Sequence, residues 1–297
     1  MHNIVYINWN PDIVALNLGF MEIRWYSVFW CLGLLAVYCL MHHLYRKQGI
    51  EEEKFEPMFI YCFFGILIGA RLGHCLFYEP VYYLSHPMEM LLPMRKLADG
   101  SWHFTGYEGL ASHGGTIGLM VALLLYSRKT KLNIMHVLDN VAIVTPVCAC
   151  AIRLGNLMNS EIIGRPTDLP WAFVFGRVDM QPRHPGQLYE AVCYFVFFFI
   201  GWIIYSRTGD ANPTNENIWR DRKHIFDTRI GSGFYFGLCI FLIFMSRILI
   251  EFTKENQVDF ESSMLFNMGQ LLSIPFVLLG IYCMLGGKYC RNLSAYK

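Results

Sequence analysis

Charged residues are scarce in this chain of 297 residues, where Asp, Glu, Lys and Arg together make up only 16%. Soluble domains average about 25% charged residues, so the low fraction argues against an ordinary water-soluble surface. The formal net charge is +1, and a nearly neutral chain has no overall field that would attract nucleic acid. We therefore expect no nucleic-acid partner.

Cysteine spacings typical of metal sites are also absent from the sequence. The ten cysteines are scattered, no Cys-x-x-Cys pair occurs, and Cys148 and Cys150 are too close together for the usual zinc pair. Most cysteines lie in apolar segments, where they serve as small apolar side chains. The alternative, a redox or metal role, has no supporting spacing, so we expect no metal at these cysteines.

Apolar runs are what the sequence has in excess. Hydrophobic residues make up 55% of the chain, and the mean hydropathy is +0.35. A helix of about 20 apolar residues crosses a bilayer core, and such spans must be helical because every backbone group in lipid needs a partner. We predict an all-α integral membrane protein, a single polytopic domain over residues 1–297, with about seven transmembrane helices near residues 25–44, 59–78, 110–126, 134–152, 188–205, 234–252 and 268–285.

Basic residues predict how these spans are oriented. Fourteen of the 24 Lys and Arg residues follow the odd-numbered spans, and positive loops stay cytoplasmic. The N-terminus is therefore expected outside and the C-terminus in the cytoplasm, with a small outer-face subdomain at about residues 80–109 and a cytoplasmic loop at about 207–229. Residues 1–10 hold no basic segment before an apolar run, so we expect no cleavable signal peptide.

Three arginines, Arg71, Arg153 and Arg247, lie within apolar segments or at their outer ends. An arginine at the membrane centre costs about 2.5–3.5 kcal/mol on insertion scales, so each of them needs a partner or a functional role. All three lie toward the outer ends of even-numbered spans, and we expect them to converge on the outer leaflet.

The richest polar segment follows the fourth span. If residues 152–164 are helical, Arg153, Asn156, Glu161 and Gly164 share one broad face. The planar guanidinium of Arg153 suits a phosphate diester, and Glu161 is placed to hold it. The alternative is a polar helix end that faces lipid headgroups, but so many polar groups exceed what anchoring requires.

Two smaller groups carry further chemistry. Arg247 and Glu251 stand four residues apart on one helix face, where a membrane pair is expected to face the bundle interior; a structural salt bridge explains them equally well. His113, which precedes Gly114 and Gly115, is the side chain type best able to exchange a proton near neutral pH. A hydrogen-bonded structural histidine is the alternative.

Together with Tyr26, at a predicted membrane interface, these residues predict an outer-leaflet cavity suited to an anionic lipid headgroup. They do not by themselves fix the reaction. A lipid or solute transporter also uses buried arginines and interior glycines. An intramembrane serine protease using Ser112 or Ser160 is disfavoured, because Ser112 and His113 are adjacent, so that their side chains point apart on a helix, and because no Gly-x-Ser-x-Gly segment is present.

The chain resembles the prolipoprotein diacylglyceryl transferase family in five motifs that occur in the same order. Residues 153–164 match the family signature Arg-x-Gly-Asn-Phe-x-Asn-x-Glu-x-x-Gly, with leucine in place of phenylalanine. The other four are Gly-Ala-Arg-Leu-Gly at 69–73, His-Gly-Gly at 113–115, His-Pro-x-Gln-Leu-Tyr-Glu at 184–190 and Arg-x-x-x-Glu at 247–251. The similarity covers most of the chain.

This resemblance implies an enzyme that moves the diacylglyceryl group of phosphatidylglycerol to the lipobox cysteine of a preprolipoprotein. A thioether forms and glycerol 1-phosphate leaves, as the first step of bacterial lipoprotein maturation. It also implies a multi-pass protein of the bacterial cytoplasmic (inner) membrane, with phosphatidylglycerol, the preprolipoprotein signal peptide and the bilayer as partners. The implied reaction calls for no metal and no organic cofactor.

The same resemblance lets us assign roles to individual residues. We expect catalysis from His113, Arg153, Arg247 and Glu251, and phosphatidylglycerol binding from Arg153, Tyr26, Asn156, Glu161 and Gly164. The two arginines would bind the phosphate, each oriented by a carboxylate, because the leaving group needs positive charge where its own charge develops. A thiol of pKa about 8.5 needs a base or a positive field to become a thiolate. His113 is the candidate base, and the field of the arginines is the alternative.

Overall fold

The computed structural model describes residues 6–91, 94–96, 100–104, 110–208, 218–219, 226–254 and 267–286, and most of them are helical. The chain forms two compact units. The first unit comprises Met1–Gln48 and Leu138–Lys297, and the second comprises Gly49–Val137. Most of the predicted cytoplasmic loop at 207–229, and part of the predicted subdomain at 80–109, lie outside the described residues.

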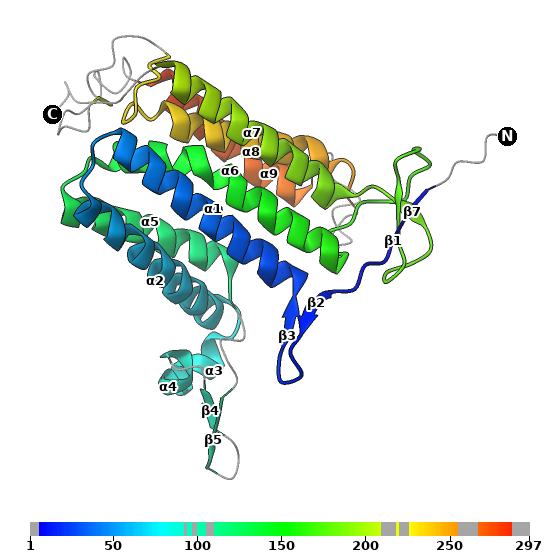
Figure 1. Ribbon diagram of the computed structural model, residues 1–297. Coiled ribbons are helices and arrows are strands. Elements are labelled where there is room, and N and C mark those ends of the chain that lie inside the picture. Colours follow the sequence, from blue (N-terminus) through cyan, green and yellow to red (C-terminus); the bar gives the residue numbers. More distant parts are fainter. Residues whose placement is uncertain are drawn as a thin grey trace. The chain divides into compact units, whose positions relative to one another are not determined.

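Long helices that run side by side make up most of the first unit (Figure 1). One end of this unit brings together the start of α1, the end of α6, the start of α7, the end of α8 and the start of α9. Polar residues from these five helix ends form the candidate site. The helices are α1 (Trp25–Lys47), α6 (Ile134–Asn159), whose first residues belong to the second unit, α7 (Gly186–Thr208), α8 (Phe234–Glu251) and α9 (Met268–Leu285).

Glycines set the close approach of α8 and α9. A Cβ added to Gly237 would lie 2.6 Å from the carbonyl oxygen of Gly280, and one added to Gly280 would lie 2.8 Å from that of Gly237. Small residues at helix contacts let backbones approach in lipid, where no hydrophobic effect drives helices together. This contact lies near the start of α8 and the end of α9, and it holds the two helices side by side.

A buried carboxylate fixes the start of α8. Asp139 of α6 is fully buried and accepts hydrogen bonds from the backbone N–H groups of Gly231 (2.8 Å), Gly233 (2.8 Å) and Phe236 (2.9 Å). The first N–H groups of a helix have no partner within the helix, and an acceptor of negative charge stabilises them. Asp139 therefore couples α6 to the start of α8.

Short strands, which the all-α prediction missed, flank the site end of the first unit. β1 (Ile7–Trp9) pairs in parallel with β6 (Phe173–Phe175), which pairs antiparallel with β7 (Pro182–Arg183), and β2 (Val14–Asn17) forms a hairpin with β3 (Glu22–Arg24). Trp9 packs on Phe173 and donates from Nε1 to the Leu157 carbonyl (2.9 Å). This hydrogen bond satisfies one of the backbone carbonyls at the carboxyl end of α6.

The second unit is built on the contact between α2 (Glu52–Phe77) and α5 (Ser112–Thr130). A Cβ on Gly73 would lie 2.7 Å from the Cα of Gly114, and a Cβ on Gly69 or Gly118 would collide with backbone of the facing helix. These glycines therefore let α2 and α5 pack closely. Beyond α2 follow α3 (Pro80–Ser85), α4 (Pro87–Leu91) and the hairpin of β4 (Met94–Lys96) and β5 (Trp102–Phe104).

Arg71 of α2 is occupied within the second unit. Its Nη2 donates to the Glu89 carbonyl (2.7 Å) and its Nε to the Met90 carbonyl (3.3 Å), while the guanidinium lies over the Tyr83 ring at 4.9 Å. These contacts tie α4 to α2 and satisfy a buried cation. Arg71 therefore has a structural role within its unit, and the expectation that it converges with the other two arginines on the outer leaflet stays a prediction.

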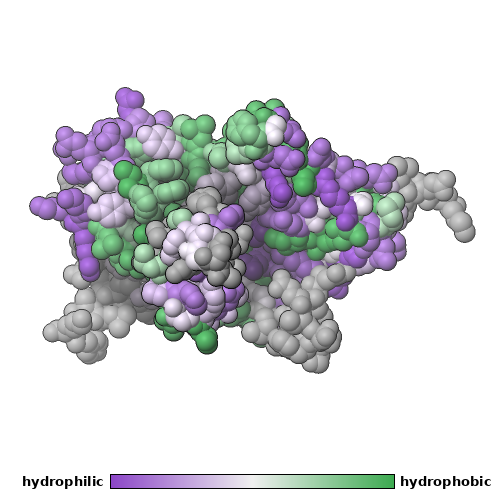
Figure 2. Space-filling view, turned by 90° about the horizontal axis from the view of Figure 1, so that it is seen from below, coloured by the Kyte–Doolittle hydropathy of each residue, from purple (hydrophilic) through white to green (hydrophobic). Residues whose placement is uncertain are grey.

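Five helices, α1, α2, α6, α7 and α8, are long and apolar enough to cross a membrane. The predicted spans near 110–126 and 268–285 coincide with α5 and α9. The apolar segment of α9, Gly269–Leu285, is shorter than the five spanning helices. Hydrophobic side chains such as Leu35, Phe64 and Leu249 are exposed, and Figure 2 shows apolar areas on the surface. Exposed apolar surface of this kind is typical of a face that lipid or a partner covers. The chain is an apolar, mostly helical protein of the multi-span membrane class.

Candidate active site at the shared helix ends

Arg153, in the last two turns of α6, is the centre of the candidate site. Its side chain is 19% exposed, and its Nε lies 2.5 Å from Oε2 of Glu190 on α7, a contact that is ionic rather than an aligned hydrogen bond. Its Nη1 donates to Oδ1 of Asn156 (3.3 Å). The guanidinium is therefore held from two sides, as a cation must be when it lies in a mostly apolar setting.

The chain turns sharply after α6, so the helix considered for residues 152–164 ends at Asn159. Ser160 and Ile162 have φ of 56° and 58°, and the backbone N–H of Glu161 returns to the Asn156 carbonyl (3.0 Å). Left-handed residues end the helix and reverse the chain. Glu161 therefore lies beyond the helix face on which the sequence predicted it.

Glu161 acts on Arg153 through Asn156. Its Oε2 accepts from Nδ2 of Asn156 (2.9 Å) and its Oε1 from Nδ2 of Asn159 (3.0 Å). An ionised carboxylate can only accept, so it fixes the Asn156 amide with Nδ2 toward Glu161 and Oδ1 toward Arg153. The direct Glu161–Arg153 pair expected from the sequence is replaced by this relay.

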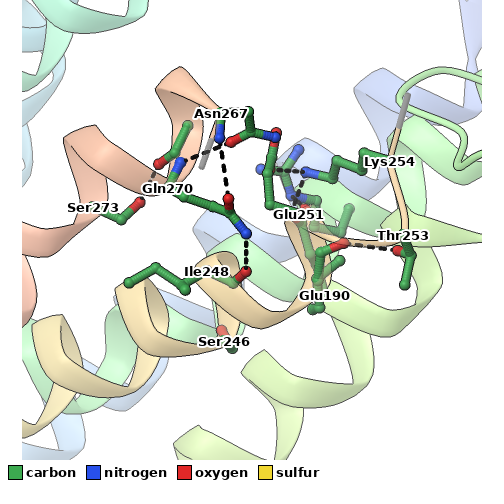
Figure 3. A network of polar contacts seen from close by, with 12 residues as sticks. Glu190, Ser246, Ile248, Glu251, Thr253, Lys254, Asn267, Gln270 and Ser273 are labelled. Atoms are coloured by element: carbon green, nitrogen blue, oxygen red, sulfur yellow. Dashed lines mark hydrogen bonds and ion pairs between the residues drawn. The ribbon is translucent and has the colours of Figure 1, made fainter. Parts of the chain in front are cut away.

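Glu190, which the sequence analysis did not assign, is the carboxylate that pairs with Arg153. It is fully buried, and its second oxygen, Oε1, accepts from Nζ of Lys254 at 2.8 Å. Lys254 also lies 3.4 Å from Oε2 of Glu251. Figure 3 shows Glu190, Glu251 and Lys254 gathered at the end of α8. A polar stripe of Gln187 and Glu190 in the first turns of an otherwise apolar helix was the available signal.

Glu251 also connects α8 to α9. Asn267 donates from Nδ2 to Oε1 of Glu251 (3.3 Å) and forms a capping box with Gln270, whose Nε2 donates to the Ile248 carbonyl at 3.1 Å (Figure 3). Glu251 is buried and faces α9 and Lys254, whereas Arg247 is exposed. Within the described residues the predicted Arg247–Glu251 pair is not formed.

Arg247 reaches the same region from α8. The Tyr194 side chain, on the face of α7 that carries Glu190, lies within electrostatic range of both Arg153 and Arg247. Since no carboxylate among the described residues pairs with Arg247, its charge is available to a ligand. Two arginines therefore lie near Tyr194, one held by a carboxylate and one not.

Tyr26, the second residue of α1, packs against Gly155 of α6. A Cβ on Gly155 would lie 2.9 Å from Cδ2 of Tyr26, so the missing side chain at Gly155 makes room for the ring. Glu161 and Arg153 both act electrostatically on the Tyr26 hydroxyl. The structure thus brings Tyr26 together with Arg153, Asn156 and Glu161, as the sequence predicted.

Gly164 lies where three chain segments meet. Its N–H donates to the His184 carbonyl (2.8 Å), and a Cβ there would lie 2.5 Å from the Thr253 carbonyl oxygen and 2.6 Å from Cβ of His184. Arg165 adds a hydrogen bond from its N–H to the Thr253 carbonyl (2.8 Å). This packing gives Gly164 a reason to be glycine that does not require contact with substrate.

His184 forms a small aromatic group beside this junction. Its Nδ1 lies 3.1 Å from the Tyr189 hydroxyl, which accepts from Nε1 of Trp171 at 3.0 Å. Burial, and then the nearby charge of Arg165, lower the pKa of the His184 imidazole below its ordinary value of 6.5. A neutral ring at pH 7 serves as a hydrogen-bond partner rather than as a cation.

His113 lies in the second unit, in the first turn of α5, and its side chain is exposed. Gly114, directly after it, is locked against α2 by the packing described above. The backbone that carries the imidazole is therefore rigid. Its assignment as the thiol base stays a prediction.

The arrangement in the first unit is a cationic site for an anionic group. Arg153, Arg247 and Lys254 supply positive charge, and the carboxylates that balance Arg153 and Lys254 are buried. No group of three or more metal-binding side chains occurs among the residues that the structure describes. Preorganised cations of this kind stabilise negative charge that develops on a reacting group.

A multi-span membrane protein with a buried cationic site for an anionic headgroup is the class that this fold and site define. The family model for prolipoprotein diacylglyceryl transferase matches residues 13–286. Relatives named phosphatidylglycerol–prolipoprotein diacylglyceryl transferase include one from Bacteroides fragilis, 55% identical over 96% of both chains, and one from Tolumonas auensis, 41% identical over 93% of this chain and 96% of its own. The chain belongs to the prolipoprotein diacylglyceryl transferase family, as its motifs indicated.

Proposed function

We propose that this protein transfers the diacylglyceryl group of phosphatidylglycerol to the lipobox cysteine of preprolipoproteins. The thiol loses its proton, its sulfur forms a bond to the diacylglyceryl carbon that carries the phosphate ester, and the carbon–oxygen bond breaks. The departing oxygen keeps the electron pair, so glycerol 1-phosphate leaves as an anion and a thioether remains. The names of the relatives, which state both substrates, support this reaction.

The held guanidinium of Arg153 is the observation on which the mechanism rests. Glu190 at 2.5 Å and Asn156 at 3.3 Å keep it in one orientation, and the nearby Arg247 adds a second positive charge. Phosphate oxygens accept hydrogen bonds from the planar edge of arginine. We assign binding of the phosphate, and stabilisation of the charge that develops on it, to Arg153 and Arg247.

The remaining residues are assigned to orientation and proton transfer. Glu161 and Asn156 orient Arg153 through the relay, Tyr26 borders the headgroup, and Glu251 holds Lys254 next to Glu190. His113 is our candidate for the base that takes the thiol proton. A thiolate can also be stabilised by the arginines' positive field, and the His113 variant described below distinguishes the two.

We also propose that the protein is one polytopic domain with seven spans in the bacterial inner membrane, with its N-terminus outside and its C-terminus in the cytoplasm. Five helices meet the criteria for spanning by length and composition, and the cluster of basic residues in the loops that follow the odd-numbered spans supports this orientation. Cysteine labelling from either side of the membrane tests the orientation.

A gel-shift assay tests the reaction directly. Purified protein, phosphatidylglycerol vesicles and a lipobox peptide should yield a lipidated peptide, and a peptide with serine in place of the cysteine should not react. Arg153→Gln should abolish most turnover, so undiminished transfer by that variant would remove Arg153 from the mechanism. His113→Asn should remove the alkaline rise in rate that a base provides. If the pH profile of His113→Asn matches that of the wild type, thiol activation is assigned to the positive field of the arginines.

A further inference from the structure

Gln187, in the first turn of α7, is fully buried, and neither its amide nitrogen nor its amide oxygen has a hydrogen-bond partner among the residues that the structure describes. Burying an amide without partners is unfavourable, because the group loses its hydrogen bonds to water. An isosteric apolar side chain would avoid that cost. A buried glutamine at this position therefore indicates that its amide binds a ligand.

The amide lies beside the candidate active site. Gln187 is three residues before Glu190, so the two side chains leave α7 on the same face. A Cβ on the preceding Gly186 would lie 3.4 Å from the Ile162 carbonyl and 3.8 Å from the side chain of Lys254. Gln187 thus belongs to the same enclosed region as the Arg153–Glu190–Lys254 network, without taking part in its ion pairs.

Other buried glutamines of the first unit are fully used within the protein. Gln48 exchanges two hydrogen bonds with Asn140, at 2.7 and 3.1 Å, and Gln270 completes the cap of α9. Both have evident structural roles. Gln187 differs from them in having its donor and its acceptor available in a region that we assign to substrate.

We propose that Gln187 hydrogen-bonds the hydroxyls of the lipid's glycerol headgroup and so selects phosphatidylglycerol as donor. This inference rests on the proposed function. A neutral amide with one donor side and one acceptor side matches a hydroxyl, which also donates and accepts. The charge of the phosphate is already matched by Arg153 and Arg247. A site that hydrogen-bonds a substrate hydroxyl discriminates strongly against an analogue that lacks it.

The test compares phosphatidylglycerol with phosphatidylpropanol, a lipid with the same phosphate and chain length of headgroup but without the two hydroxyls. We expect wild-type kcat/KM for lipobox-peptide transfer to be about 10- to 100-fold lower with phosphatidylpropanol. Gln187→Met should lower kcat/KM with phosphatidylglycerol by a similar factor and use the two lipids about equally. The matched control, Gln48→Met, should lower Tm but keep the wild-type preference between the lipids.

Each outcome separates this inference from the proposed function. Wild-type protein that transfers nothing from phosphatidylglycerol contradicts the function itself. Wild-type protein that uses both lipids equally, or a Gln187→Met variant that keeps the full preference, overturns the role of Gln187 alone. Should Gln187→Met not fold, as judged by its thermal transition, Gln187→Leu serves for the same comparison.

Discussion

Glu190 of α7 and Arg153 of α6 form an ion pair in which the carboxylate is fully buried and shared with Lys254. One negative charge thus holds two cations, at 2.5 Å from Nε of Arg153 and 2.8 Å from Nζ of Lys254. Removing one member of a buried charge network leaves the others uncompensated, which costs more than the network contributes when intact. The position of Arg153 therefore depends on Glu190.

Replacing Glu190 tests this dependence. Glu190→Gln keeps the shape but leaves Arg153 and Lys254 without their shared counter-charge, so we expect a loss of about 3–5 kcal/mol in stability and a fall of about 10- to 100-fold in kcat. Thermal unfolding in detergent and the peptide gel-shift assay measure the two effects. Glu51→Gln, which removes an exposed pair with Lys54 at 3.1 Å, is the control and should change neither. A Glu190→Gln protein that keeps the wild-type kcat would contradict the positioning role.

Lysine substitutions should separate the two arginines. Arg153→Lys cannot keep both the contact of Nε with Glu190 and the hydrogen bond of Nη1 to Asn156, and we expect a loss of about 100-fold or more in kcat/KM. Arg247 is exposed and forms no ion pair among the described residues. Arg247→Lys should therefore retain more activity, measured with the same peptide assay. Equal losses would show that the guanidinium shape matters at both positions.

Much of the fold could be predicted from the sequence because long apolar runs have few alternatives in a membrane. The seven segments that we predicted coincide with helices. The strands β1, β6 and β7 could not be predicted, since they are two or three residues long and β1 pairs with β6 across more than 160 positions of the chain, as in Ile7 with Phe173. Strands of that length have no detectable period.

The sequence predicted most residues of the candidate site but not which of them form ion pairs with each other. Tyr26, Arg153, Asn156 and Glu161 do come together, but Glu190 replaces Glu161 as the direct partner of Arg153. The reason is local: left-handed residues after Asn159 turn the chain, and no sequence period announces them. Which carboxylate meets which cation depends on how α6, α7 and α8 pack, and that is a tertiary property.

The relay from Glu161 gives a prediction of its own. In Glu161→Gln the neutral amide can donate as well as accept, so the Asn156 amide is no longer fixed with Oδ1 toward Arg153. We expect about a 10-fold loss of kcat/KM with little change in Tm, because Glu161 is exposed. Asn159→Ala removes only the second contact of Glu161, at 3.0 Å, and should have a smaller effect. A larger loss in Asn159→Ala than in Glu161→Gln would contradict the relay.

Gly164 should not tolerate even a methyl group. In Gly164→Ala the new Cβ would lie 2.5 Å from the Thr253 carbonyl and 2.6 Å from Cβ of His184, so the segments that meet there must separate. We expect a lower Tm and a strong loss of transfer, because the same segment carries Glu161. Gly176→Ala, whose Cβ would have its nearest neighbour, in Asn10, at 3.5 Å, should behave as wild type.

The adjacent glycines after His113 provide the last comparison, in the second unit. A Cβ on Gly114 would collide with the Gly69 backbone, whereas one on Gly115 would lie 3.5 Å from Cβ of Ala70, an ordinary contact. Gly114→Ala should therefore force α2 and α5 apart and lower Tm by several degrees, since overpacking costs about 1–3 kcal/mol. Gly115→Ala should keep the wild-type Tm. If only Gly115→Ala loses activity while folding normally, the space above that glycine is used by substrate rather than by helix packing.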